Sequence, residues 1–117
     1  MGRDKEMIFS KSNHIEQIIA GTKTQTRRPS DKYQIGKTYA IQPGRGKPGI
    51  EKYRILITGK RKEYRGETVS VEDALAEGGY TPEEYETLYE SMYPSWLVRY
   101  VYTFRVVGEG KLFKLKN

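Results

Sequence analysis

The sequence predicts an α+β fold in one domain spanning residues 1–117, a small β-barrel with helices packed at its side. From Leu97 to Val107, apolar and polar residues alternate as on a long β-strand. Thr81-Pro82-Glu83-Glu84 is a capping box with proline at the first helical position, and it marks a helix start. The other apolar residues form short runs separated by helix-like segments, which favours a mixed fold.

The N-terminal part predicts a strand followed by a helix. Met7–Phe9 is a short apolar run typical of a strand. Ser12 is a candidate cap for a helix that extends to Ala20 and ends at Gly21. The apolar residues of this helix lie on one face: Ile15, Ile18 and Ile19.

Two further strands are expected before residue 60. Pro29 ends any regular element formed by the polar segment 23–28. Tyr39–Ile41 and Tyr53–Thr58 are predicted strands, and the second places Tyr53, Ile55 and Ile57 on one face. Pro43–Gly49 between them is a glycine-rich and proline-rich loop.

Two capped helices precede the last strand. Ser70 caps a helix whose apolar stripe is Val71, Ala74 and Leu75, and Gly78-Gly79 ends it. The helix after Thr81 ends at Pro94. Its predicted inner positions are Tyr85, Leu88, Tyr89 and Met92.

The last long strand is predicted to be half-buried. Its apolar positions are Val98, Tyr100, Tyr102, Phe104 and Val106. Its other face includes Arg99, Thr103 and Arg105, which favours solvent on that side. A short terminal strand is expected within Lys111–Lys116.

Composition excludes several classes of function. Without cysteine, the chain has no disulfide and no thiolate nucleophile. No apolar run approaches the roughly 20 residues that span a bilayer. Met1–Glu6 is charged and does not resemble a signal peptide, so we expect a cytoplasmic protein. The only histidine, His14, is expected to be an exposed helix residue that binds no metal.

Positive charge is concentrated in one part of the sequence. Residues 21–65 hold 13 Lys/Arg and 3 Asp/Glu, whereas residues 66–95 hold no Lys/Arg and 8 Asp/Glu. A concentrated positive field favours a polyanionic partner such as RNA. The alternative is that the acidic segment partly neutralises the basic one within the fold.

The segment Gly21-Thr22-Lys23-Thr24-Gln25-Thr26-Arg27-Arg28 joins a helix stop to a cluster of cations and hydroxyls. It resembles the signature of ASCH domains, in which a glycine is followed by a lysine, spaced threonines and an arginine. Other pieces resemble the family in the same order: Ile35-Gly36, Gln42-Pro43-Gly44-Arg45-Gly46, Ser70–Gly78 and Met92-Tyr93-Pro94. The resemblance covers most of the chain. It implies a PUA-like β-barrel with a cleft linked to RNA binding.

One branch of this family hydrolyses N4-acetylcytidine to cytidine and acetate, with a lysine proton acceptor, a threonine nucleophile and a glutamate proton donor. Lys23 and Thr26 match that motif, and Glu77 is the best match for the glutamate, although Gly78-Gly79 is one residue longer than the branch pattern. Other ASCH proteins have been associated with RNA cleavage or RNA binding, so the resemblance narrows the partner more than the reaction.

The proposed chemistry sets two requirements. Lys23 must have a lowered pKa to take a proton, and Arg27 and Arg28 supply positive charge that would lower it. On a regular strand Lys23 and Thr26 would point to opposite faces, so a turn or bulge is required between them.

A second group of side chains is a candidate for contacts to a ligand. Arg45, Lys47 and Arg54 are cations in or near the glycine-rich loop, which could equally be a flexible surface loop. Tyr93 and Trp96 could stack on a base, or serve as core or lid residues. The full candidate binding set is Arg27, Arg28, Gln42, Arg45, Lys47, Arg54, Tyr93 and Trp96.

The sequence therefore predicts a domain that binds RNA or a modified nucleoside in a basic cleft, without a metal or another cofactor and without a membrane partner. The alternatives are an N4-acetylcytidine amidohydrolase, a ribonuclease and a protein-interaction module. The oligomeric state is left open.

Overall fold

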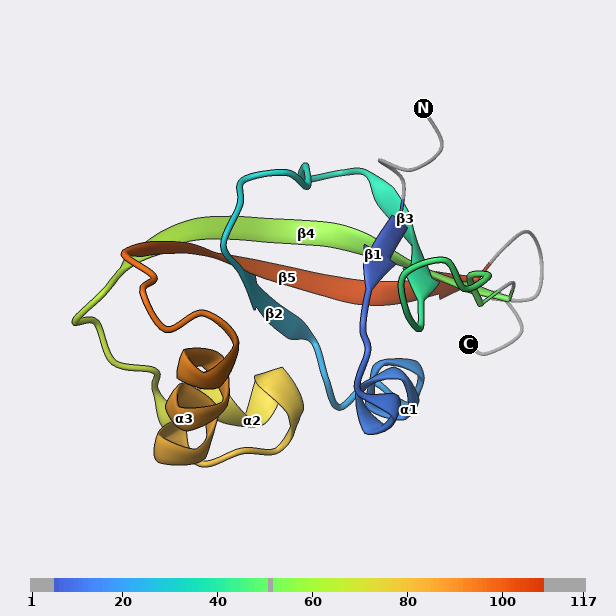
Figure 1. Cartoon of the computed structure of the whole chain (residues 1–117). Helices are drawn as coiled ribbons and strands as arrows, with labels where there is room; N and C mark the ends of the chain where they lie inside the picture. The colour runs from blue at the N-terminus through green and yellow to red at the C-terminus, as the bar shows by residue number, and fades with distance from the viewer. Residues whose placement is uncertain (1–5, 51, 109–117) are drawn as a thin grey trace.

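The computed structural model describes residues 6–50 and 52–108 (Figure 1). The elements in chain order are β1 (Glu6–Ile8), α1 (Ser12–Ala20), β2 (Gln25–Arg28), β3 (Thr38–Gln42), β4 (Tyr53–Tyr64), α2 (Val71–Gly78), α3 (Pro82–Met92) and β5 (Val98–Gly108). The predicted α+β class is confirmed. The strand expected within Lys111–Lys116 lies outside the described residues.

The strands form one mixed sheet in the order β1-β3-β4-β5-β2. β1 pairs with β3 in parallel, and the other neighbouring strands are antiparallel. β1 and β2 lie at the two edges, and within the described residues they do not pair with each other. The sheet is therefore open, and these pairings do not form the closed barrel that the sequence led us to expect.

A long two-stranded ribbon of β4 and β5 supports the rest of the fold. β4 continues to Tyr64, well past the predicted end at Thr58. The extension is rich in charged residues, so the sequence showed no strand pattern there, but it pairs with β5 along its length. The register shifts between Ile57 and Gly59. At Gly59 a Cβ atom would lie 2.5 Å from the Thr103 hydroxyl oxygen, so this close approach requires glycine.

The main hydrophobic core covers one face of this ribbon. It comprises Met7, Phe9, Ile18, Tyr33, Tyr39, Ile41, Ile55, Ile57, Tyr102 and Phe104. α1 packs on it through Ile18 and Ile15, whereas Ile19 is 39% exposed. α1 begins at Ser12 with Lys11 in the N-cap position, one residue earlier than predicted for the cap, and Gly21 ends the helix at a φ of 87°. Only a glycine adopts this left-handed conformation at little cost.

A second core cluster lies where α2 and α3 pack at the far end of the ribbon: Val69, Ala74, Tyr85, Tyr89 and Trp96. α3 begins with the predicted capping box. Here the prediction of a half-buried last strand is wrong in part, because Arg99 and Val101 on its second face are also buried, whereas Arg105 on the same face is exposed as predicted. The predicted stripe of α2 is also wrong in part, since Val71 and Leu75 are exposed. α2 buries Ala74 and Glu77 instead.

The helices are divided into two groups. Figure 1 shows α1 apart from the α2–α3 pair, on the same side of the β4–β5 ribbon and with β2 between them. No helix of the described residues has the length and hydropathy needed to cross a membrane.

Candidate functional site

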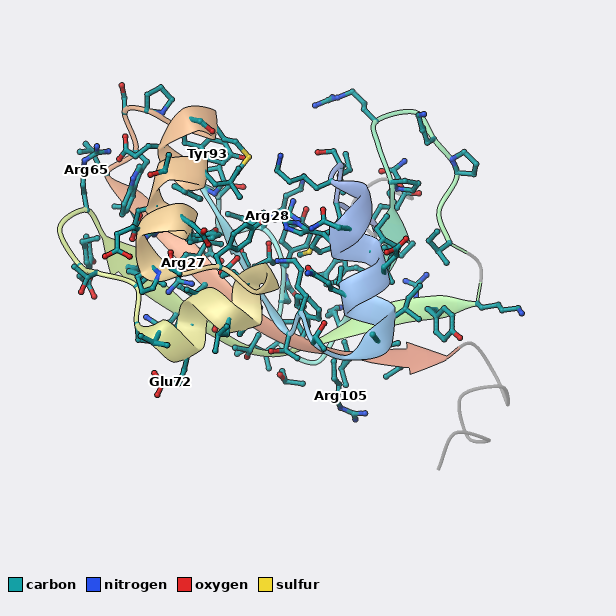
Figure 2. All side chains as sticks on the ribbon, turned by 90° about the horizontal axis from the view of Figure 1, so that it is seen from below. Arg27, Arg28, Arg65, Glu72, Tyr93 and Arg105 are labelled. Atoms are coloured by element: carbon teal, nitrogen blue, oxygen red, sulfur yellow. The ribbon has the colours of Figure 1, made fainter. Side chains whose placement is uncertain are left out.

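A cleft of about 1770 Å³ opens between α1 and α3. Figure 2 shows Arg28 in the space between these two helices, and Tyr93 at the end of α3. The polar and aromatic residues that line the cleft are Glu6, Phe9, Ser10, Lys11, His14, Lys23, Thr26, Arg27, Arg28, Ser30, Lys32, Tyr33, Gln42, Arg45, Lys47, Glu77, Tyr85 and Tyr93. The cleft therefore collects side chains from segments far apart in the sequence, from β1 to the end of α3.

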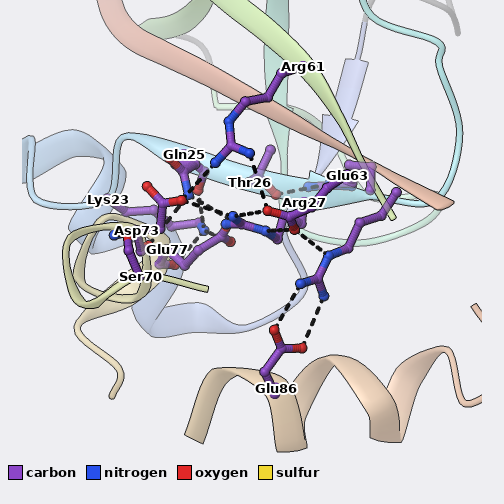
Figure 3. Close-up of polar contacts among 12 residues, drawn as sticks. Lys23, Gln25, Thr26, Arg27, Arg61, Glu63, Ser70, Asp73, Glu77 and Glu86 are labelled. Carbon is purple, nitrogen blue, oxygen red and sulfur yellow. Dashed lines mark hydrogen bonds and ion pairs between the residues drawn. The ribbon is translucent and has the colours of Figure 1, made fainter. Parts of the chain in front are cut away.

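Lys23 lies at the inner end of this cleft. It belongs to the irregular segment between α1 and β2, and only 2% of its surface is exposed. Its Nζ donates hydrogen bonds to the backbone carbonyls of Gln25, at 2.8 Å, and Glu77. The Glu77 carboxylate oxygen Oε1 lies 3.6 Å from the same nitrogen (Figure 3).

Burial lowers the pKa of Lys23 to about 8, against the opposing effect of the Glu77 carboxylate, and the positive charge of Arg28 lowers this pKa further. A lowered pKa makes the neutral form of Lys23 more accessible near neutral pH than that of an ordinary lysine. A neutral amine can accept a proton, so this environment meets the first requirement for a lysine base.

Thr26 lies on β2 and is 5% exposed. Its Oγ1 accepts a hydrogen bond from Arg28 Nε at 3.1 Å. Because Lys23 precedes the regular strand, its side chain and that of Thr26 line the same cleft. The irregular segment therefore allows both side chains to face one cleft.

Glu77 lies in the last turn of α2 and is 1% exposed. Its Oε2 accepts hydrogen bonds from Arg27 Nη1 at 2.8 Å and from Gln25 Nε2 at 3.3 Å. α2 is itself fixed at its start by Ser70, whose hydroxyl accepts a hydrogen bond from the Asp73 backbone N–H. The carboxylate is therefore held rigidly beside Lys23.

A buried network of ion pairs joins α2 and α3 to the sheet (Figure 3). Arg27 lies at its centre and contacts three carboxylates, those of Glu63, Asp73 and Glu77. The cations of the network are Lys23, Arg27, Arg61 and Arg99, and its anions are Glu63, Asp73, Glu77 and Glu86. With four charges of each sign the network is neutral, which limits the cost of burying it.

Arg28 differs from its neighbour Arg27. It is half-buried, its guanidinium lies 4.8 Å from the centre of the Phe9 ring, and its Nη2 donates to the Ile8 carbonyl at 2.7 Å. Among the residues that the structure describes, it contacts no carboxylate. Its positive charge is therefore available to a ligand in the cleft.

The structure brings together most of the side chains predicted for ligand contact. Gln42, Arg45, Lys47 and Tyr93 line the cleft with the residues already described. The remaining two residues of the predicted set lie elsewhere. Arg54 contacts Thr38 on the neighbouring strand, and Trp96 is 8% exposed within the second core cluster.

The prediction that His14 is an exposed helix residue is wrong. His14 is half-buried, lines the cleft, and its Nε2 lies 2.7 Å from the Tyr80 hydroxyl. Burial, followed by the charge of Lys23, lowers the pKa of His14 to about 4, so this side chain is neutral near pH 7. Its partner is 66 residues away, and no local pattern indicates such a contact.

Tyr85 is a second cleft residue that sequence reasoning assigned only to the core. Its ring is 4% exposed and lies 5.8 Å from the Arg27 guanidinium. Burial, and then the nearby Glu77 carboxylate, raise the pKa of Tyr85, so the phenol stays protonated. It can therefore act as a hydrogen-bond donor at the cleft wall.

Comparison with known proteins yields a match in structure alone. No protein-family model matches the chain, and no curated protein matches it. The crystal structure of an ASCH domain from Lactobacillus crispatus JV V101 is similar, with a TM-score of 0.69 and 16% sequence identity. The match covers 86% of this chain and 76% of the bacterial domain. A likeness at this sequence identity establishes the fold alone, so the function must be inferred from the residues of the cleft.

Proposed function

We propose that this chain, which has the fold of an ASCH domain, binds RNA or a modified nucleoside in the cleft between α1 and α3. The observation that carries the proposal is that cations from separate elements meet in this one cleft, around the half-buried Arg28. Lys11 comes from the start of α1, and Arg45 and Lys47 come from the loop after β3. Cations grouped in this way attract the phosphates of a nucleic acid.

The size and lining of the cleft support the same proposal. Its volume of about 1770 Å³ exceeds the roughly 300–1,000 Å³ of typical small-molecule pockets. Tyr93, just after α3, provides aromatic surface against which an unpaired base can pack, and Leu88 on α3 adds apolar surface to the same cleft. We therefore expect a single-stranded segment or one of its nucleosides, because a stacked duplex hides the faces of its bases.

The binding proposal is tested by titrating a fluorescein-labelled cytidine-rich hexanucleotide RNA and measuring fluorescence anisotropy at 50 and 200 mM salt. Phosphate contacts predict weaker binding at the higher salt, because the release of the RNA's counterions is less favourable when the salt concentration of the solution is higher. Arg28→Gln should weaken binding, whereas Arg105→Gln, which removes an exposed charge on β5, should leave it unchanged. Salt-independent binding, or equal effects of the two variants, would contradict the proposal. Cleavage of the RNA during the titration would instead favour a ribonuclease.

The second candidate function is hydrolysis of N4-acetylcytidine. The observation that favours it is the grouping of Lys23, Thr26 and Glu77 along one cleft, with Lys23 Nζ 3.6 Å from the Glu77 carboxylate. The lowered pKa of Lys23, which lines the same cleft as the buried Thr26 hydroxyl, suits a base that activates a nucleophile. Each of these side chains is buried, so water competes little for their hydrogen bonds.

In this reaction the Thr26 oxygen attacks the acetyl carbonyl carbon while neutral Lys23 takes the hydroxyl proton. Lys23 passes this proton to the Glu77 carboxylate beside it. Glu77 then delivers the proton to N4 as the bond between the carbonyl carbon and N4 breaks, so that N4 leaves as the amine of cytidine. Water attacks the resulting acetyl-threonine ester and gives acetate. Neutral Lys23 takes one proton from this water and returns it to the threonine oxygen, and the acetic acid releases the other proton to solvent, which restores the starting state.

Cytidine release from N4-acetylcytidine, followed by chromatography, tests this mechanism. Lys23→Ala and Thr26→Ala should abolish release, and Thr26→Ser should retain part of it because the hydroxyl is kept. Since Lys23 must be neutral, kcat/KM should rise with pH and level off above about 8. Full activity in both alanine variants would refute the assigned roles, and no release by the wild type would leave binding as the function.

A further inference from the structure

The two sides of the cleft differ in chemistry. The side formed by α3 is apolar and aromatic, and its lining residues are Tyr85, Leu88, Met92 and Tyr93. The side formed by the start of α1 and the β3–β4 loop carries Lys11, Arg45 and Lys47. Figure 2 shows Arg28 between these sides, with α3 on one side of it and α1 and the loop on the other.

The cations of the basic side have no carboxylate partner among the residues that the structure describes. Lys11, Arg45 and Lys47 are exposed, and none forms an ion pair with a carboxylate of the described residues. Arg28 is half-buried and likewise forms no ion pair with a carboxylate of the described residues, whereas its neighbour Arg27 contacts three carboxylates. A cation withdrawn from water is usually paired, so the exception indicates where an external anion would bind.

Arg28 also has a donor left for such an anion. Its Nε donates to Thr26 and its Nη2 to the Ile8 carbonyl, and these bonds fix the plane of the guanidinium. Its Nη1 makes no hydrogen bond to any described residue. A guanidinium held in this way matches the oxygens of a phosphate well.

We propose that the cleft takes a nucleotide in preference to an uncharged nucleoside, with the phosphate on Arg28 and the base against α3. This inference rests on the proposed function and adds to it the charge and the orientation of the ligand. The base then packs on Leu88 and Tyr93, while the phosphate faces the basic side.

Arg28 has a second possible effect that the experiment must separate. Its charge lowers the pKa of Lys23, so its loss would also alter the site for an uncharged ligand. That effect does not depend on whether the ligand carries a phosphate. Comparing ligands with and without phosphate on the same variants isolates the phosphate contact.

The test is isothermal titration calorimetry with cytidine, cytidine 5′-monophosphate and a cytidine trinucleotide. The wild type should bind the monophosphate at least about tenfold more tightly than cytidine. Arg28→Gln should remove most of this difference between the two ligands, in addition to any change in the Kd of cytidine that acts through Lys23. Arg45→Gln on the exposed loop should reduce the difference. Leu88→Ala should weaken cytidine and its monophosphate by the same factor. Arg105→Gln is the matched control and should change none of these values.

The outcomes separate this inference from the function on which it rests. Equal affinities for cytidine and its monophosphate would overturn the inference and keep the proposed function, as would equal weakening of both by Arg28→Gln. If none of the three ligands binds, both are overturned. Tighter binding of the trinucleotide than of the monophosphate would support the inference and indicate that the phosphate belongs to an RNA strand. Similar affinities for these two ligands would indicate that the cleft binds a free nucleotide. Unchanged thermal unfolding of each variant confirms that the fold is intact, and Arg45→Gln keeps the test decisive if Arg28→Gln is unstable.

Discussion

Loss of the Arg27 side chain should lower the free energy of unfolding more than loss of any exposed charge does. Arg27→Met tests this, because it removes the charge and keeps an apolar side chain. Arg27 donates to Glu63 at 2.8 and 3.0 Å, to Glu77 at 2.8 Å and to Asp73 at 3.0 Å. Its side chain is fully buried, and its loss leaves the network with one more carboxylate than cations. Breaking a buried pair in this way costs about 3–5 kcal/mol of unfolding free energy.

The matched control is Arg61→Met. Arg61 contacts two of the same carboxylates, Glu63 at 3.2 Å and Asp73 at 2.7 Å, but its side chain is 51% exposed. Water compensates for the loss of an exposed partner, so the expected cost is below about 1 kcal/mol. Urea unfolding followed by circular dichroism measures both values. A cost of less than 1 kcal/mol for Arg27→Met, or equal costs for the two variants, would refute the reasoning.

The same variant should change the dependence of stability on pH. Burial would raise the pKa of Glu63, but hydrogen bonds and charge from Arg27 and Arg99 lower it to about 2, from the ordinary 4.5. A carboxyl with a lowered folded-state pKa adds stability that is complete above about 4.5 and is lost as the pH falls toward 2. In Arg27→Met this pKa rises, so the stability gap between wild type and variant should narrow below pH 4.5.

Three further predictions concern stability, and all are measured by urea unfolding. Because the folded-state pKa of Lys23 is lowered from 10.5 to about 8, the fold disfavours the protonated form of this lysine. The free energy of unfolding of the wild type, relative to Lys23→Met, should therefore rise by about 3 kcal/mol between pH 8 and 10.5. A difference that stays constant with pH would contradict this. Thr81→Ala removes the hydroxyl that accepts the Glu84 N–H and should cost about 1 kcal/mol, whereas no change would argue against the capping box. Gly59→Ala should cost about 1–3 kcal/mol because the new Cβ meets the Thr103 hydroxyl, and Thr103→Ala in the same chain should recover part of it; failure to recover would point to a backbone cause.

Local signals were enough to predict most of the secondary structure. The Thr81 capping box, the glycine that ends α1 and the alternation along β5 each act over a few residues, and each has the predicted local form. The charged second half of β4 escaped prediction because its strand character comes from pairing with β5. The burial of Arg99 likewise depends on α3, which covers it through Glu86.

The candidate site shows the same division. Lys23, Thr26 and Arg28 lie close together in the sequence, so a short segment sufficed to single them out. The roles of His14 and Glu63 depend on partners far along the chain, Tyr80 and Arg27, and no local pattern indicates such contacts. Trp96 was a candidate for base stacking, and the structure holds its ring between core residues and Arg99, whose guanidinium lies 4.1 Å from the ring centre.

The central claim, that a nucleic-acid ligand occupies the cleft between α1 and α3, is tested most directly by nuclear magnetic resonance. Titration of a cytidine-rich hexanucleotide RNA into ¹⁵N-labelled protein should shift the backbone amides of residues 8–11, 25–28 and 42–47, which surround the cleft, and leave those of the exposed face of α2 around Val71 and Leu75 unchanged. Shifts that gather on the α2 face, or no shifts at saturating RNA, would contradict the claim.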